Sequence, residues 1–270
     1  MSGGTWGSRD AAAEWERVTS ARAQFFAPAT ERMLDLAGIA AGSHVLDIGA
    51  GAGETSLLAA RRVGPGGFVL ATDISATMLE LATIAAFDQG LTQFQTRVMD
   101  AQNLELGSDS FDVAISRFAL MLVPDIGRAL REIHRVLRAG GRLAALVFAR
   151  CPYLSLPHAV ARRVGYVTSA PKPFGEFRLA APGVMQYMYE HVGFRDVAVH
   201  EMSTRRRFPS LAAAIDYAKN SPLPLRELLA QLTPAQQDQA WREIEVELAQ
   251  FVGADGFESP CDLLIGVGTK

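Results

Sequence analysis

Three glycines alternate with alanines directly after a short apolar segment that ends near an acid, in the sequence VLDIGAGAG at residues 45–53. Glycine has no side chain, so such a segment lets a ligand approach the backbone closely. Free backbone N–H groups at the start of a following helix favour a polar or anionic ligand group. We therefore predict a ligand-binding turn made of Asp47, Gly49, Ala50, Gly51 and Gly53.

Two further acids end the next two apolar segments. Asp73 closes VLATD and Asp100 closes VMD. A carboxylate at the first of these positions can accept hydrogen bonds from ribose hydroxyls, and a carboxylate beside an adenine ring can accept from its exocyclic amine. Ile74 and Met78 are placed to hold such a ring between them, although core packing explains these two residues equally well.

The spacing of the glycines bears on which nucleotide binds. The dinucleotide pattern is G-x-G-x-x-G, whereas residues 49–53 read G-x-G-x-G, and no Gly-Lys-Ser/Thr phosphate loop follows. The sequence therefore favours another adenosine-containing ligand, and a nicotinamide-dependent oxidoreductase, using NAD or NADP, is the less favoured alternative.

The elements that must position these residues alternate along the chain. We predict strands at residues 44–49, 68–74, 94–100, 111–120 and 142–148, and helices at residues 54–63, 75–90 and 125–141. A helical segment at residues 11–38, broken by Pro28, precedes them. This alternation predicts an α/β fold, a Rossmann-like three-layer sandwich around a mostly parallel sheet.

The pattern changes after residue 150, where prolines become frequent. We predict one overall domain with four parts: an N-terminal helical cap at residues 1–40, a ligand-binding core at 41–150, a lid insert at 151–185, and a C-terminal part of the sheet at 186–270. The last part has strands at 195–202 and 261–270 and a helical insert at about 208–253. Both inserts are interpreted as lid material.

The composition narrows the classes of function. The chain has 270 residues, 49% of them hydrophobic, and a formal net charge of −3, which gives no overall basic field for nucleic acid. No apolar run reaches the roughly 20 residues that a bilayer span needs. Cys151 and Cys261 have no metal-ligand spacing. We expect a cytoplasmic protein with reduced thiols, no metal site, no membrane segment and no nucleic-acid partner, its oligomeric state left open.

Taken together, these residues resemble the class I S-adenosylmethionine-dependent methyltransferase family, over roughly residues 45–148. VLDIGAGAG, ATDIS, MDAQNL and FDVAISRFALMLVPD are similar to that family's successive motifs. LREIHRVLRAGGRLAAL resembles the ubiquinone/menaquinone C-methyltransferase-like branch.

The resemblance implies a seven-stranded sheet whose last strand, residues 261–270, is antiparallel to the others and pairs with residues 195–202. It also implies S-adenosyl-L-methionine as the cofactor. The cofactor-binding residues implied in this way are Asp47, Gly49, Ala50, Gly51, Gly53, Asp73, Ile74, Met78, Asp100, Ala101, Ser116 and Arg117.

The sequence identifies neither the methyl acceptor nor a catalytic residue. Many relatives have a histidine after the fourth strand, where this chain has Leu120, Met121 and Leu122, so no general base is assigned there. Candidate bases in the inserts, each better explained by a structural role, are Tyr153, His158, Tyr166, Tyr187 and His191. Arginines 205–207 suit either a solvated strand end, the favoured interpretation, or an anionic acceptor.

The apolar and aromatic inserts favour a small, partly apolar organic acceptor, methylated at oxygen, nitrogen or carbon. A protein that keeps the cofactor as a structural or regulatory ligand, without methyl transfer, is the second alternative.

Overall fold

The computed structural model describes residues 25–165, 175, 177–220 and 224–270. In this part of the chain, eight strands form one sheet, seven of them in the order β3-β2-β1-β4-β5-β8-β6, while β7 pairs with β8. The strands are β1 His44–Ile48, β2 Phe68–Asp73, β3 Phe94–Val98, β4 Phe111–Arg117, β5 Leu137–Arg150, β6 Arg195–Phe208, β7 Val252–Gly253 and β8 Gly256–Thr269.

Strands β1 to β5 pair in parallel, whereas β8 is antiparallel to both β5 and β6. This confirms the predicted Rossmann-like α/β fold, a mostly parallel sheet with an antiparallel last strand. Continuous runs of buried residues in β1, β4 and β5 show that both faces of the central sheet are covered.

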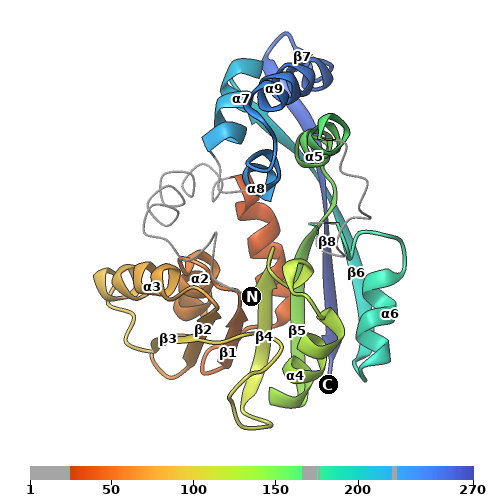
Figure 1. Cartoon of the computed structure of the whole chain (residues 1–270). Helices are drawn as coiled ribbons and strands as arrows, with labels where there is room; N and C mark the ends of the chain where they lie inside the picture. Colours follow the sequence, from red (N-terminus) through yellow and green to blue (C-terminus); the bar gives the residue numbers. More distant parts are fainter. Residues whose placement is uncertain (1–24, 166–174, 176, 221–223) are drawn as a thin grey trace.

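Helices connect the strands and cover the sheet (Figure 1). They are α2 Glu54–Val63, α3 Ala76–Asp88, α4 Ile126–Val136, α5 Pro152–Val164, α6 Val184–His191, α7 Leu211–Asn220, α8 Pro224–Leu229 and α9 Pro234–Ala249, with a short 3₁₀ helix, η1, at Leu120–Leu122. Ser75 caps α3 as predicted, because its side chain accepts a hydrogen bond from the N–H of Met78.

Two predictions about the helices are wrong. The predicted helix at 125–141 ends at Val136, because Leu137 already belongs to β5 and pairs with Phe111. Residues 25–37 form one continuous helix that Pro28 does not break. This helix buries Phe26, Met33 and other apolar side chains against the core, and that packing stabilises it.

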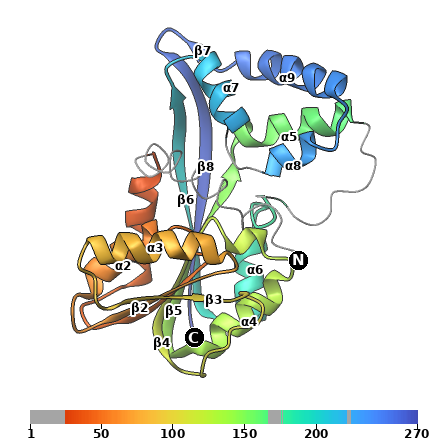
Figure 2. The same ribbon diagram turned by 60° about the vertical axis from the view of Figure 1, so that its left-hand side comes forward.

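The hairpin of β6 and β8 is longer than predicted and decides the shape of the molecule. Its strands continue past the last β5–β8 pair, Arg150 with Asp262, as far as the pair of Phe208 with Phe257. Helices α5, α7, α8 and α9, here called the distal helices, pack together beside this extension (Figures 1 and 2). Because α5 follows directly from the end of β5, the distal helices lie beyond the carboxyl ends of the parallel strands. The division into a cap, a core and two inserts stays a prediction, and residues 1–24 of the cap lie outside the described residues.

Within the described residues, no helix is both long enough and apolar enough to cross a bilayer.

Candidate functional site

The glycine turn joins the end of β1 to the start of α2. The N–H groups of Gly49 and Ala50 donate to the carbonyl of Thr72 on β2, at 2.8 and 2.9 Å. A Cβ on Gly49 would lie 2.2 Å from the Cβ of Ala119, and one on Gly53 would lie 2.7 Å from the Cβ of Ala82. Both glycines also have positive φ, 69° and 83°. The packing of neighbouring elements therefore requires glycine here, in addition to any approach of a ligand.

Asp73 is brought directly to this turn. Its Oδ2 accepts from the N–H of Gly51 at 2.9 Å, and its Oδ1 accepts from the N–H of Ser75 at 2.9 Å. Burial nevertheless raises the pKa of its carboxyl above the ordinary value. Each carboxylate oxygen can accept a second hydrogen bond, so Asp73 retains acceptor capacity for the hydroxyls of a ligand.

Asp47 lies beneath the turn and is 1% exposed. Its Oδ2 accepts from the hydroxyl of Ser56 at 2.5 Å, and its Oδ1 is buried without a hydrogen-bond partner among the described residues. Burial raises the pKa of Asp47 to about 6, although the bond from Ser56 and the charge of Arg117 oppose the shift. A cationic group of a ligand near the turn would favour the ionised form of this carboxyl.

The residues expected around an adenine ring gather at the adjoining strand ends. The N–H of Met99 donates to the carbonyl of Asp73 at 2.9 Å, which places Asp100 and Ala101 beside the end of β2. Asp100 is exposed and accepts from the backbone N–H of Gln102 at 2.9 Å. Ile74 is 54% exposed and available to a ligand, whereas Met78 is 4% exposed and lies against the turn at Gly51.

Ser116 and Arg117, at the end of β4, already have protein partners. The hydroxyl of Ser116 donates to the carbonyl of Ile48 at 3.1 Å and accepts from the N–H of Leu120 at 3.2 Å. Arg117 forms an ion pair with Glu54, the first residue of α2, with an Nη1–Oε1 distance of 3.1 Å. The contribution of Glu54 was not predicted; its position directly after the last glycine is the only signal in the sequence.

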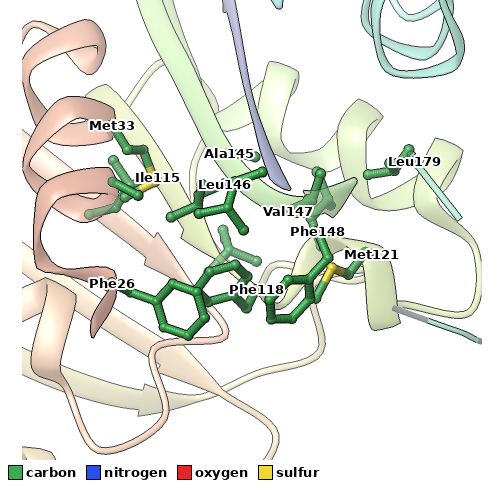
Figure 3. Close-up of a cluster of buried hydrophobic side chains, with 14 of the residues drawn as sticks. Phe26, Met33, Ile115, Phe118, Met121, Ala145, Leu146, Val147, Phe148 and Leu179 are labelled. Atoms are coloured by element: carbon green, nitrogen blue, oxygen red, sulfur yellow. The ribbon is translucent and has the colours of Figure 1, made fainter. Parts of the chain in front are cut away.

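Four phenylalanines from distant parts of the chain meet near the carboxyl ends of β4 and β5. The Phe118 ring stacks on that of Phe148 at 4.5 Å between centroids, and the Phe26 ring lies 4.6 Å from that of Phe118 (Figure 3). Phe177 lies 6.4 Å from Phe148. Phe118 also has a φ of 57°, an unusual value for a bulky residue that is typical of functional turns. These residues are called the aromatic cluster.

The candidate bases do not form a catalytic group. The hydroxyl of Tyr153 donates to the carbonyl of Ala214 at 2.6 Å, and Nδ1 of His158 lies 2.7 Å from the carbonyl of Leu154. Tyr187 and His191 stack on each other at 5.4 Å between ring centroids on α6. Because α6 ends shortly before β6 begins, these two residues lie near the start of that strand and not at its carboxyl end. Tyr166 lies outside the described residues. No catalytic residue is therefore assigned.

Two features define the class of this protein. One is the strand order, and the other is the turn that brings Gly51, Asp73 and Asp47 together at the carboxyl ends of β1 and β2. These are features of a Rossmann-like α/β protein that binds an adenosine-containing cofactor. Residues 46–145 match the model of a family described as "Methyltransferase domain". Residues 46–145 thus form a methyltransferase domain, and this domain together with the fold supports a class I S-adenosylmethionine-dependent methyltransferase with S-adenosylmethionine as its cofactor.

Individual relatives agree with this assignment. The chain is 29% identical to nocamycin O-methyltransferase of Saccharothrix syringae over 74% of this chain and 76% of that protein. It is 39% identical to the ubiquinone/menaquinone biosynthesis C-methyltransferase UbiE of Hahella chejuensis, over 43% of this chain and only 47% of that protein. The chain thus covers less than half the length of this second relative.

Solved structures share the fold. A phosphoethanolamine N-methyltransferase 2 of Haemonchus contortus, in complex with S-adenosyl-L-methionine, has a TM-score of 0.57 at 21% identity, covering 90% of this chain and 52% of that chain. The [4+2]-cyclase SpnF has a TM-score of 0.57 at 18% identity, covering 90% of this chain and 80% of that chain.

Proposed function

We propose that this protein transfers a methyl group from S-adenosylmethionine to an oxygen, nitrogen or carbon atom of a small, partly apolar organic acceptor. The observation that carries the proposal is the position of the aromatic cluster. Phe118 directly follows Ser116 and Arg117 at the end of β4, and the hydroxyl of Ser116 is bonded to the last residue of β1, just before the glycine turn. The cluster places largely buried apolar rings next to the predicted cofactor site, which favours an apolar acceptor there.

The residues around the turn fit the cofactor. We propose that Asp73 accepts hydrogen bonds from the ribose hydroxyls and that Asp100, Ala101, Ile74 and Met78 surround the adenine. Asp47 and the turn at residues 49–53 would face the amino-acid part. Ser116 and Arg117 complete the site by holding the end of β4 against β1 and α2. When bound, S-adenosylmethionine supplies a methyl group already activated by its sulfonium.

The protein's own contribution would be mainly orientation and exclusion of water. Holding two reactants in a productive geometry can supply about 7–11 kcal/mol of a barrier. A general base adds about 10²–10⁴-fold, and only where the acceptor must lose a proton. The absence of an assigned base therefore does not conflict with methyl transfer.

The net charge of −3 and the aromatic cluster support a small organic acceptor over nucleic acid. The alternative is a protein that binds the cofactor without transferring a methyl group. One observation favours it, because a protein named as a cyclase shares this fold. Cofactor binding and methyl transfer must therefore be measured separately.

Methyl transfer is tested with S-adenosylmethionine that carries an isotopically labelled methyl group and a panel of small phenols, carboxylic acids, amines and enolisable ketones. We expect label on at least one acceptor, detected by mass spectrometry together with S-adenosylhomocysteine. Asp73→Ala should lose most of this activity, whereas Asp88→Ala, a change at an exposed acid at the end of α3, should retain it. Tight binding of the cofactor with no label transferred to any acceptor would favour the non-methylating alternative.

A further inference from the structure

One arginine of the segment 205–207 differs from its two neighbours. Successive side chains of a strand point to opposite faces. Arg205 and Arg207 are exposed and both pair with Glu258 of β8, at 2.8 and 2.6 Å. Arg206 points to the other face and is only 7% exposed. The favoured prediction of a solvated strand end therefore holds for Arg205 and Arg207 and is wrong for Arg206.

Arg206 is surrounded by aromatic rings from four separate elements. Its guanidinium carbon lies 4.7 Å from the ring centroid of Tyr153 on α5 and 4.9 Å from that of Tyr217 on α7. Phe208 on β6 and Phe25 on the helix at 25–37 lie at 5.6 and 5.8 Å. Such contacts stabilise a cation through the faces of the rings.

The rings leave the hydrogen-bonding capacity of Arg206 unused. A guanidinium has five N–H donors, and no described residue accepts a hydrogen bond from Arg206 or forms an ion pair with it, whereas Arg205 and Arg207 have both. Buried charges are ordinarily paired, because removing an unpaired charge from water is costly. The Arg206 side chain is only 7% exposed and no described carboxylate pairs with it, so an anionic group from outside the chain would supply the missing ion-pair partner.

Arg206 is also linked to the predicted reaction centre. Its neighbour Phe25 packs edge-on against Phe26 at 4.5 Å, and Phe26 packs against Phe118 at 4.6 Å, beside the end of β4. A continuous series of packed rings thus connects the extension of β6 with the aromatic cluster.

We propose that Arg206 binds an anionic group, a carboxylate, of the methyl acceptor, at a distance from the atom that is methylated. The planar guanidinium fork matches a carboxylate in a two-bond arrangement, and the flanking rings suit an acceptor whose carboxylate is attached to an aromatic or conjugated system. Arg206 is a specificity-determining residue in this scheme, and it takes no part in the chemical step. The inference rests on the proposed function, since it names the class of acceptor for that site.

The test compares acids with their neutral analogues. Benzoate, 2-naphthoate and anthracene-2-carboxylate are titrated by calorimetry, each alongside its carboxamide, with and without saturating S-adenosylhomocysteine. We expect at least one acid to bind at least tenfold more tightly than its amide. Arg206→Met should reduce this preference to about twofold or less, and Arg206→Lys, which keeps the charge but not the fork, should retain part of it. Arg205→Met is the matched control on the outward face and should leave the preference unchanged.

Binding of S-adenosylhomocysteine separates the two proposals. Normal binding by Arg206→Met shows that the variant is folded; if it does not fold, the wild type and Arg206→Lys still decide the question. Acids and amides that bind alike to the wild type, or an acid preference that survives in Arg206→Met, would overturn the role of Arg206. An acid preference in a protein that does not bind S-adenosylhomocysteine would instead retain the anion site and reject the proposed function.

Discussion

Among the acids of the predicted cofactor site, Asp47 has the environment that differs most from that of an ordinary carboxyl. Because burial raises its pKa from 3.8 to about 6, the folded protein binds more protons than the unfolded chain between these two values. The stabilisation from the protonated carboxyl is complete below pH 3.8 and is lost as the pH rises through about 6.

We therefore predict that Asp47→Asn changes the pH dependence of stability. Relative to the variant, the wild type should lose about 2.4 kcal/mol of unfolding free energy between pH 4 and pH 7, since each pKa unit corresponds to about 1.4 kcal/mol and part of the titration lies below pH 4. Urea unfolding of both proteins at the two pH values measures this difference. A constant difference between them would show that Asp47 titrates normally.

Gly49 tests whether the turn needs glycine for packing or only for its backbone angle. Gly49→Ala introduces a Cβ 2.2 Å from the Cβ of Ala119. Gly90 has a similar φ, 67°, but a Cβ there would meet no atom within 4 Å. We expect Gly90→Ala to cost about 1–2 kcal/mol from backbone strain alone, and Gly49→Ala to cost about 1–3 kcal/mol more because of the clash. Equal losses in thermal melts would exclude a packing role for Gly49.

At the scale of elements, the ion pair of Arg117 and Glu54 joins the end of β4 to the start of α2. The Arg117 side chain is 9% exposed, and its Nη1 also lies 3.4 Å from the hydroxyl of Thr30 on the helix at 25–37. One guanidinium therefore connects three elements around the predicted cofactor site.

Removing one partner of a largely buried pair leaves the other charge uncompensated, which costs about 3–5 kcal/mol where burial is complete. Because the Glu54 side chain is 22% exposed, we expect Arg117→Met to lower the unfolding free energy by about 2–3 kcal/mol. Arg117→Met combined with Glu54→Gln should recover part of this loss. Arg163→Met, which breaks surface pairs with Glu243 and Glu247, should hardly change the melt. A double variant no more stable than Arg117→Met would argue against the pair.

At the scale of the whole molecule, ligand binding should appear as thermal stability. A ligand that binds only the native state stabilises it by about 2.7 kcal/mol at a hundred times its dissociation constant. For a chain of this size each kcal/mol raises the melting temperature by roughly 2–4 °C.

We therefore expect S-adenosylhomocysteine to raise the melting temperature by about 5–10 °C and NAD to leave it unchanged. Mass spectrometry should first show that the purified protein carries no cofactor. NAD also contains adenosine, so a difference between the two ligands shows the effect of the part of the ligand other than adenosine. Stabilisation by NAD alone would contradict S-adenosylmethionine as the cofactor and favour the nicotinamide-dependent oxidoreductase.

The sequence by itself determined the sheet and the order of the strand-end residues. Local periodicity and short glycine turns are sufficient for parallel strands joined by helices. Because the carboxyl ends of such strands meet at one edge, the sequence alone places Asp47, the turn at 49–53, Asp73 and Asp100 together. Their contacts with one another, such as Gly51 to Asp73, follow from that arrangement.

The tertiary structure alone decided what surrounds this edge. Phe26, Phe118, Phe148 and Phe177 are far apart in the sequence, and only the folded chain brings their rings together. The sequence does not show where the β6–β8 hairpin ends. Its pairing, with Arg206 opposite Ser259, carries the strand past β5 and fixes which arginine faces the distal helices. In a two-residue repeat, a shift of one position would expose Arg206 and bury its neighbours, and only long-range pairing sets that register.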